Sequence, residues 1–201
     1  MGYTFFAQKR EKTKGNEIMN VKKMTLSAVM IALSAVLSMV KVYQLPLGGS
    51  ITLLSMLPVM SVAICYGTKT GIFVSFLYAC VQIALDLGAL MGYGMTAATW
   101  VGCLVFDYIL AYGILGISGI FRKHGVFGIS IGIALACFFR FVSHFISGAI
   151  VFSVWCPDGF NVYWYSLVYN GSYMLPELIV TVVGAMLLFR VKGVKKLIEN
   201  R

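Results

Sequence analysis

Long apolar runs, separated by short polar, glycine-containing or basic breaks, make up most of the sequence after residue 24. A run of about 20 apolar residues is long enough to cross a bilayer as a helix. The pattern predicts helices over residues 24–44, 52–66, 71–90, 98–121, 126–154 and 172–190. The second run is the shortest and contains Pro58. A stretch rich in tryptophan and tyrosine precedes the last run and predicts a loop.

The composition is that of a membrane protein. Hydrophobic residues make up 60% of the 201 residues and charged residues only 11%, and the mean hydropathy is +0.89. Such a chain cannot present a polar surface to water on every side. We therefore expect an all-α integral membrane protein, folded as a six-transmembrane-helix bundle within the lipid bilayer.

The positively charged residues indicate how the bundle is oriented. If all six runs span, both tails and two of the turns lie on one side of the membrane and hold 14 of the 16 lysine and arginine residues. Cytoplasmic segments carry such an excess, so both termini are predicted to be cytoplasmic. The expected division is a basic tail over 1–23, a transmembrane domain over 24–191 and a basic tail over 192–201. The net charge of +9 then follows from topology, and we expect no nucleic acid partner.

Ionisable residues inside the apolar runs are candidates for a functional site. Asp107 and His144 lie within predicted helices, and the stretch from Arg140 to Glu177 also holds two of the three tryptophans. Charged groups within membrane spans are costly and usually face a partner or a cavity. In the predicted topology Asp86, Asp107, His144 and Glu177 all lie toward the outer side. These groups therefore predict a site that opens outward.

The same residues also permit structural interpretations. Asp107 and Arg140 could form a salt bridge that only holds helices together, and the aromatic residues could form a belt at the headgroup level. The five cysteines contain no C-x-x-C pair and are expected to pack as small hydrophobic residues. We expect no metal site, no cofactor and no catalytic residue.

The residue types suggest which ligand such a site would hold. Aromatic faces together with a desolvated carboxylate suit a flat, cationic, aromatic molecule, which the rings attract by stacking and cation–π contacts. His144 and Asn170 can add directional hydrogen bonds to a heterocycle. A flat organic cation is the ligand inferred.

Four groups of short motifs occur along the chain. They are Arg140-Phe141, Ser143-His144-Phe145 and Ser147-Gly148; Tyr165-Ser166-Leu167, Tyr169-Asn170, Ser172-Tyr173 and Pro176-Glu177; Phe106-Asp107-Tyr108 and Ala111-Tyr112, with Gly116, Gly119 and Phe121; and Gly48-Gly49-Ser50-Ile51-Thr52-Leu53. Together they resemble the thiamine-specific S-component of energy-coupling-factor vitamin transporters, over about residues 24–190. The resemblance implies a six-helix protein of the bacterial cell membrane that binds thiamine from outside. It also implies a partner module, made of a transmembrane T-component and two ATPases, on which the S-component topples.

The resemblance assigns roles to particular residues. Asp107 would face the thiazolium cation, while His144, Tyr165 and Asn170 would contact the vitamin; Tyr169, from the same motif, belongs to the expected site. The turn with Pro46, Gly48 and Gly49 would form a lid over the site. Ala28 and Ala32 match the small-xxx-small face that docks on the transmembrane partner, although ordinary helix packing uses the same spacing.

The sequence departs from the family pattern in two places. Some relatives carry a glutamate at the start of the second helix, where this chain has none, and Thr52 or Ser55 is expected to replace it. A tryptophan that follows the histidine motif in relatives has Phe152 and Trp155 as candidate counterparts.

Three other functions remain open from the sequence. The chain could be an S-component for another vitamin or for a thiamine precursor, or a membrane scaffold that binds no small molecule. It could also be an intramembrane hydrolase that uses Ser143 or Ser166 with His144. No phosphate-loop motif occurs, so ATP hydrolysis is assigned to a partner.

Overall fold

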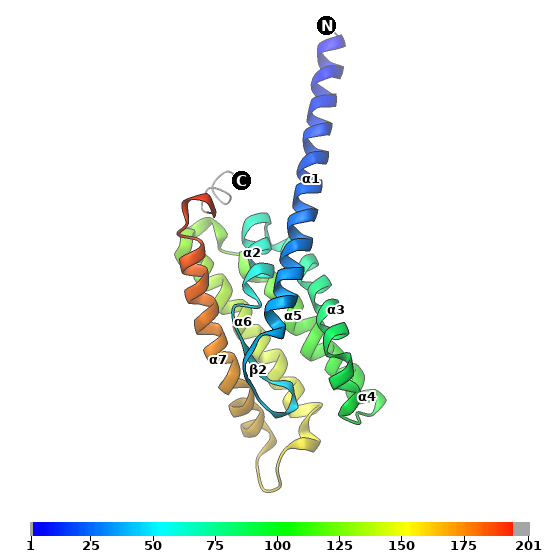
Figure 1. The fold of residues 1–201 in the computed structure, drawn as a ribbon, viewed down its shortest axis with the longest axis vertical. Coiled ribbons are helices and arrows are strands. Elements are labelled where there is room, and N and C mark those ends of the chain that lie inside the picture. The colour runs from blue at the N-terminus through cyan, green and yellow to red at the C-terminus, as the bar shows by residue number, and fades with distance from the viewer. Residues whose placement is uncertain (1, 195–201) are drawn as a thin grey trace.

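The computed structural model describes the backbone of residues 2–194 and the side chains of residues 20–194. It is a helical bundle with one small hairpin (Figure 1). The principal helices are α1 (Gly2–Met39), α2 (Leu57–Tyr66), α3 (Thr68–Gly92), α4 (Ala97–Cys103), α5 (Ala111–Gly113), α6 (Gly125–Ile150) and α7 (Val162–Leu188). Shorter elements are the strands β1 (Lys41–Gln44) and β2 (Ser50–Thr52), the 3₁₀-helices η1 (Pro46–Gly48), η3 (Ile114–Gly119), η4 (Arg122–His124) and η5 (Ser153–Trp155), and the π-helix η2 (Leu104–Leu110). Most of the predicted C-terminal tail, residues 195–201, lies outside the described residues.

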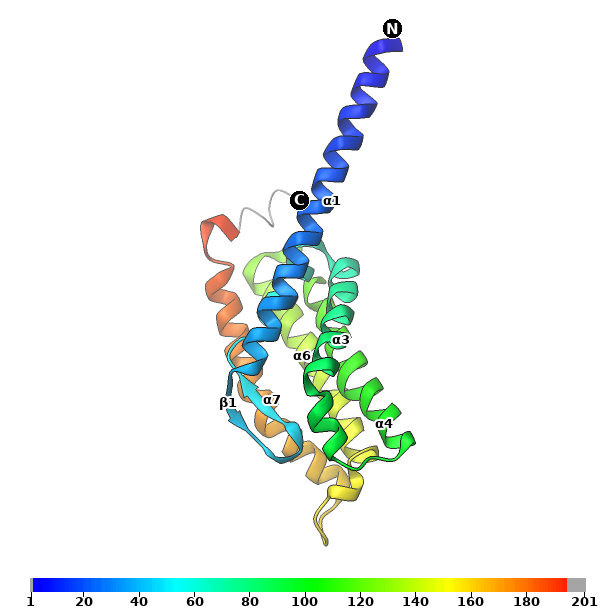
Figure 2. The same ribbon diagram turned by 45° about the vertical axis from the view of Figure 1, so that its right-hand side comes forward.

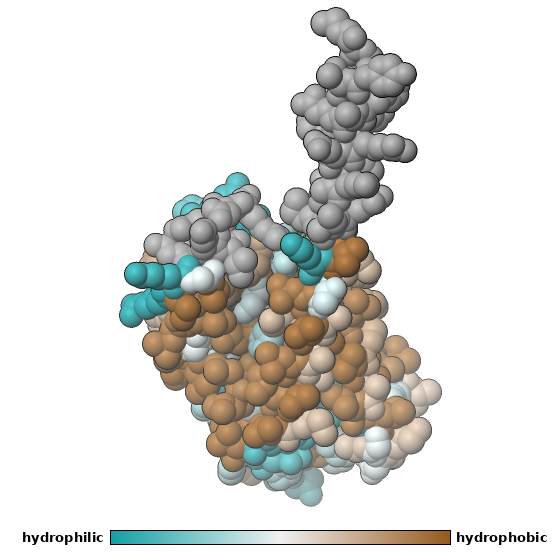
Figure 3. All heavy atoms as spheres, turned by 45° about the horizontal axis from the view of Figure 1, so that its top comes forward, coloured by the Kyte–Doolittle hydropathy of each residue, from teal (hydrophilic) through white to brown (hydrophobic). Residues whose placement is uncertain are grey.

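The membrane character expected from the sequence is confirmed. Within residues 2–194, five helical segments are long and apolar enough to span a membrane: Asn20–Met39, Thr68–Gly92, Ala97–Gly119, Arg122–Ile150 and Val162–Leu188. Figure 3 shows a broad apolar surface along the side of the bundle, with polar groups toward its two ends. The N-terminal end of α1 and the C-terminal end of α7 lie at the same end of the bundle (Figure 1). The cytoplasmic orientation of that end stays a prediction.

The second predicted helix is shorter than expected. Helix α2 has ten residues, which corresponds to about 15 Å or half of the hydrocarbon core. Leu54 has a positive φ of 61°, which breaks the helix predicted from residue 52. Pro58 then lies in the first turn, where its missing N–H costs nothing. Eight of the ten α2 residues are buried, so this short helix is enclosed by its neighbours on all sides.

A β-hairpin fills the space that the rest of a sixth span would take. The first predicted helix, over 24–44, ends at Met39, and β1 pairs antiparallel with β2 in a register that joins Tyr43 to Ile51. Gly48 has a φ of 93° in the turn, and the Leu45 N–H donates to the Gly49 carbonyl at 2.7 Å. Figure 2 shows the hairpin beside α7.

The helix predicted over 98–121 changes its geometry along its length. The chain is α-helical in α4, becomes π-helical over η2 and then narrows to a 3₁₀-helix in η3. Asp107 lies within the π-helical segment. Short π-helical segments occur often at functional sites because they reorient side chains that a regular helix would direct elsewhere.

The prediction of a loop directly before the last helix is wrong, because the structure has a helix there. Helix α7 begins at Val162, ten residues before the predicted start. The Asn161 side chain caps it by accepting from the N–H groups of Tyr163 and Trp164 at 3.0 and 3.1 Å, as N-cap residues do. The helix predicted over 126–154 corresponds to α6, which ends four residues before the predicted end, at Ile150. Glu177 therefore lies near the middle of α7 instead of in its first turns.

Glycines allow the helices to approach one another closely. A Cβ atom on Gly116 would lie 2.2 Å from the backbone nitrogen of Ile72 in α3, and one on Gly119 would lie 2.2 Å from the carbonyl oxygen of Ala63 in α2. Neither contact can relax by moving a flexible side chain, because both neighbours are backbone atoms. Small residues serve this purpose in membrane helix packing generally.

We expect Gly116→Ala to destabilise the bundle by about 1–3 kcal/mol, because the new methyl group forces η3 away from α3. Thermal unfolding of the purified protein in detergent measures the effect. Gly113→Ala is the matched control, since a Cβ atom there meets nothing within 4 Å. Equal melting temperatures for the two variants would contradict the packing role of Gly116.

Candidate functional site

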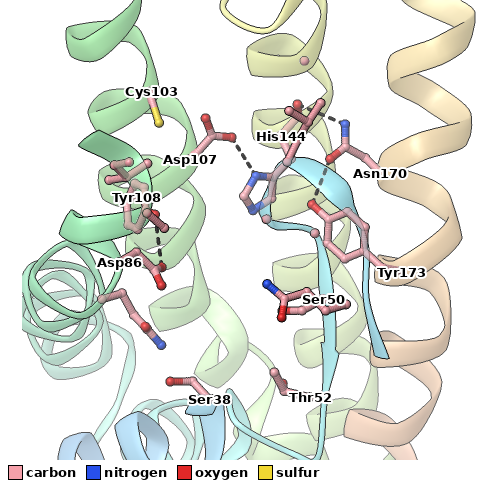
Figure 4. Close-up of a pocket in the computed structure, with 18 of the residues that line it drawn as sticks. Ser38, Ser50, Thr52, Asp86, Cys103, Asp107, Tyr108, His144, Asn170 and Tyr173 are labelled. Atoms are coloured by element: carbon pink, nitrogen blue, oxygen red, sulfur yellow. Dashed lines mark hydrogen bonds and ion pairs between the residues drawn. The ribbon is translucent and has the colours of Figure 1, made fainter. Parts of the chain in front are cut away.

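A cavity of about 530 Å³ lies between the hairpin and helices α3, α6 and α7. Seven of the eight residues predicted to bind a ligand line it: Thr52, Ser55, Asp107, His144, Tyr165, Tyr169 and Asn170. Figure 4 shows several of them around one hollow. Their shared position is a finding of the structure, whereas their contacts with a ligand stay predictions.

Asp107 and His144 are joined by a hydrogen bond at one end of the cavity. The Asp107 Oδ1 atom lies 2.8 Å from His144 Nδ1 (Figure 4), and Ser147 Oγ donates to Asp107 Oδ2. Arg140 Nε donates to His144 Nε2 at 3.4 Å. Because Nε2 accepts, the ring proton lies on Nδ1 and is directed at the carboxylate. The cavity therefore holds a carboxylate oriented by two donors.

The salt bridge considered between Asp107 and Arg140 does not form. Across the described side chains, Arg140 pairs with no carboxylate, and Asp107 is hydrogen-bonded to His144 instead. Arg140 is instead buried with its guanidinium 4.7 Å from the centre of the Tyr112 ring and in contact with the Met56 sulfur. Asp107 and Arg140 are linked only through His144, so a simple structural pair does not account for Asp107.

Asn170 is held in place by α6 and α7. Its Nδ2 donates to the Ser166 carbonyl at 2.9 Å and to the His144 carbonyl at 3.3 Å, while Tyr173 donates to its Oδ1 at 2.9 Å. A Cβ atom on Gly148 would lie 2.3 Å from Ser166 Oγ, so only glycine allows this approach of the helices. The second lone pair of Oδ1 is what Asn170 can offer a ligand.

The hairpin covers the cavity and is attached to α7. Gly49 N–H donates to the Tyr169 hydroxyl at 3.1 Å, and that hydroxyl donates to the Pro46 carbonyl. A Cβ atom on Gly49 would lie 2.8 Å from Tyr173 Cε1. Tyr165 stacks on Tyr169 with ring centres 6.0 Å apart. These contacts place the predicted lid over the site; its movement stays a prediction.

Glu177 is a cavity residue that the sequence analysis placed toward the outer site but did not assign a contact with the ligand. It is only 4% exposed, lines the cavity and accepts a hydrogen bond from Thr52 Oγ1 at 2.5 Å. Thr52 is also 2.6 Å from Ser55 Oγ. A carboxylate within an apolar run was the available signal, but the assumed start of the last helix placed it too near the membrane edge.

Trp155 lies behind the cavity wall and does not line it. Its ring centre lies 5.3 Å from that of Phe152 and 6.5 Å from that of Tyr93, and both of these residues are lining residues. Of the two candidate counterparts of the family tryptophan, Phe152 is the one that faces the cavity. Burial, and to a smaller extent the negative charge of Asp86, raises the pKa of the Tyr93 phenol.

The structure does not support the hydrolase alternative, which requires a hydrogen bond between a serine hydroxyl and His144. Ser143 Oγ donates to the Phe106 carbonyl at 2.6 Å and Ser166 Oγ donates to the Phe145 carbonyl at 2.8 Å. In the part of the chain that the structure describes, neither hydroxyl bonds to His144. A nucleophile needs such a contact with its base.

Ala28 and Ala32 are both exposed on α1, whereas Ser27 and Ser34 are buried. The two alanines therefore lie on the outer surface of the bundle, where a partner helix could reach them. Their docking role stays a prediction.

Comparisons with known proteins agree on one family. A family model described as "Thiamine transporter protein" matches residues 24–197. The thiamine transporter ThiT of Bacillus subtilis (strain 168) is 31% identical over an alignment of 176 residues, and the match covers 81% of this chain and 87% of that protein. A solved structure of ThiT from Listeria monocytogenes has a TM-score of 0.72 and 20% identity, and the match covers 90% of this chain and 98% of that chain. The structural likeness confirms the expected all-α membrane fold.

Proposed function

Because the chain belongs to the thiamine transporter family, we propose that it captures thiamine in the cavity described above, from the outer side of a bacterial membrane. It is a transport protein and not an enzyme. In the proposed mechanism it is the S-component of an energy-coupling-factor importer. A separate transmembrane protein and two ATPases then supply the energy for delivery inward.

The observation that carries the proposal is the Asp107 carboxylate within an aromatic cavity. Thiamine joins a thiazolium cation to an aminopyrimidine through one methylene group. The carboxylate matches the cation, and tyrosine rings such as Tyr165 and Tyr169 offer faces for stacking. A cavity of about 530 Å³ is also within the size range of small-molecule sites.

Titrating the purified protein with thiamine while recording tryptophan fluorescence tests the proposal. We expect a saturable change at one ligand per chain, because Trp155 contacts two residues of the cavity wall. Trp155→Phe should lose most of the signal while isothermal titration calorimetry still detects binding. An uncharged vitamin such as riboflavin should not compete. The absence of saturable thiamine binding by calorimetry would overturn the proposal, and stronger binding of another vitamin would reassign the substrate.

A further inference from the structure

The π-helical segment η2, which carries Asp107, ends with a hydrogen bond that departs from the π-helical pattern. In a π-helix each N–H donates to the carbonyl five residues earlier, so the pattern assigns the Ala111 N–H to the Phe106 carbonyl. That N–H donates instead to the Tyr108 carbonyl. The Phe106 carbonyl, directly before Asp107, therefore does not receive the donor that its winding would give it.

A side chain from α6 supplies a donor to this carbonyl. Ser143 is buried, and its Oγ donates to the Phe106 carbonyl at 2.6 Å. One turn later on α6, Ser147 donates to Asp107 Oδ2, and His144 contacts Asp107 Oδ1. Helix α6 thus holds the backbone beside Asp107 with one residue and the carboxylate itself with two.

Ser143 has no direct route to a ligand. Among the described residues that line the cavity, α6 contributes Arg140, His144 and Gly148, but not Ser143. A serine hydroxyl has a single proton to donate, and that proton is used at Phe106. An effect of Ser143 on ligand binding would therefore act through the backbone of η2.

The segment that follows η2 is fixed by close packing. Gly116 and Gly119 in η3 lie against the backbone of α3 and α2, so η3 cannot rotate freely. A hydrogen-bonded π-helical turn holds one residue more than an α-helical turn. If η2 relaxed to a regular α-helix, Asp107 would rotate by about 100° relative to η3, which is the angle for one residue. Its carboxylate would then leave His144 and Ser147.

We infer that Ser143 is a positioning residue for Asp107. Its hydrogen bond to the Phe106 carbonyl stabilises the π-helical winding of η2, and this winding directs the Asp107 carboxylate into the cavity, toward the thiazolium of thiamine. The inference rests on the proposed function. It adds a residue outside the cavity to those on which thiamine affinity depends.

A double-mutant cycle tests the inference. The Kd for thiamine is measured by calorimetry for the wild type, Ser143→Ala, Asp107→Asn and the double variant. Ser143→Ala should raise Kd about tenfold, because the Phe106 carbonyl loses a buried donor and the winding of η2 loses its support from α6. In the Asp107→Asn background the same substitution should change Kd by less than about twofold, since the charge that Ser143 positions is absent.

Ser118→Ala is the matched control. Ser118 is also buried and donates to a backbone carbonyl of another helix, that of Met60 at 3.4 Å, and it does not line the cavity. Its Kd should equal that of the wild type. An unchanged Kd in folded Ser143→Ala, or an equal loss in Ser118→Ala, overturns the inference. An equal loss from Ser143→Ala in both backgrounds also overturns it, because Ser143 would then act on the fold as a whole.

Two further outcomes are distinguishable. A wild type that binds no thiamine removes the proposed function, and the inference with it. If Ser143→Ala does not fold, Ser143→Cys takes its place, since a thiol has similar size and is only a weak donor. Ser143→Cys should raise Kd when Asp107 is present and leave it unchanged in Asp107→Asn; the same Kd ratio in both backgrounds overturns the inference.

Discussion

Replacing Asp107 with asparagine should weaken thiamine binding by about 1–3 kcal/mol, or roughly 5- to 150-fold in Kd. The variant keeps the shape of the side chain and removes the negative charge that is proposed to face the thiazolium. It also disturbs the contact with His144 Nδ1, which directs its proton at Asp107 Oδ1 from 2.8 Å. Calorimetric titration with thiamine gives the Kd, and a melting curve shows whether the variant is folded.

Asp158→Asn is the control for this measurement. It removes one negative charge from an exposed position that does not line the cavity, so its Kd should equal that of the wild type. If Asp107→Asn binds thiamine as tightly as Asp158→Asn does, the positive ring of the vitamin does not depend on Asp107 and its assigned role is wrong.

Ala28→Trp should abolish thiamine uptake while leaving thiamine binding unchanged. Ala28 is exposed on α1 and does not line the cavity, so a large side chain there cannot reach the ligand. It would, however, keep α1 away from the helix of the proposed transmembrane partner, because the proposed interface depends on small residues. Uptake of radiolabelled thiamine is measured in cells or vesicles that contain the complete transporter, alongside Kd for the isolated protein.

Leu175→Trp provides the comparison, because Leu175 is 59% exposed on α7 and belongs to another surface of the bundle. Its uptake should be close to that of the wild type. Normal uptake by Ala28→Trp would rule out α1 as the docking surface, and a loss of thiamine binding would show that the substitution acts on the fold.

The apolar runs predicted the bundle because each long helix must cover about 30 Å of hydrocarbon. That length requires about 20 consecutive apolar residues, which are visible in the sequence. The hairpin was not predicted, since its strands contain only four and three residues and lie next to apolar runs. A run of apolar residues does not distinguish a short strand from the end of a helix. Leu54, with its positive φ, gives no sequence signal for the break.

The candidate site was predicted in part for a related reason. Asp107, His144 and Asn170 were identifiable because polar groups in membrane helices are exceptional. The position of Glu177 depended on where α7 begins, and the aromatic residues after Asn161 suggested an interfacial loop instead of a helix. Asn161 as an N-cap was the missed signal. The π-helical geometry around Asp107 depends on tertiary contacts and has no comparable pattern.

The short length of α2 affects how a ligand could enter the cavity. Helix α2 covers about half of the membrane thickness, and the hairpin lies in the other half (Figure 1). The hairpin is tied to α7 by the Tyr169 hydroxyl and by Thr52, a small number of polar contacts. We therefore expect an entrance to open by a local movement of the hairpin, about a dozen residues, while the five long helices keep their positions.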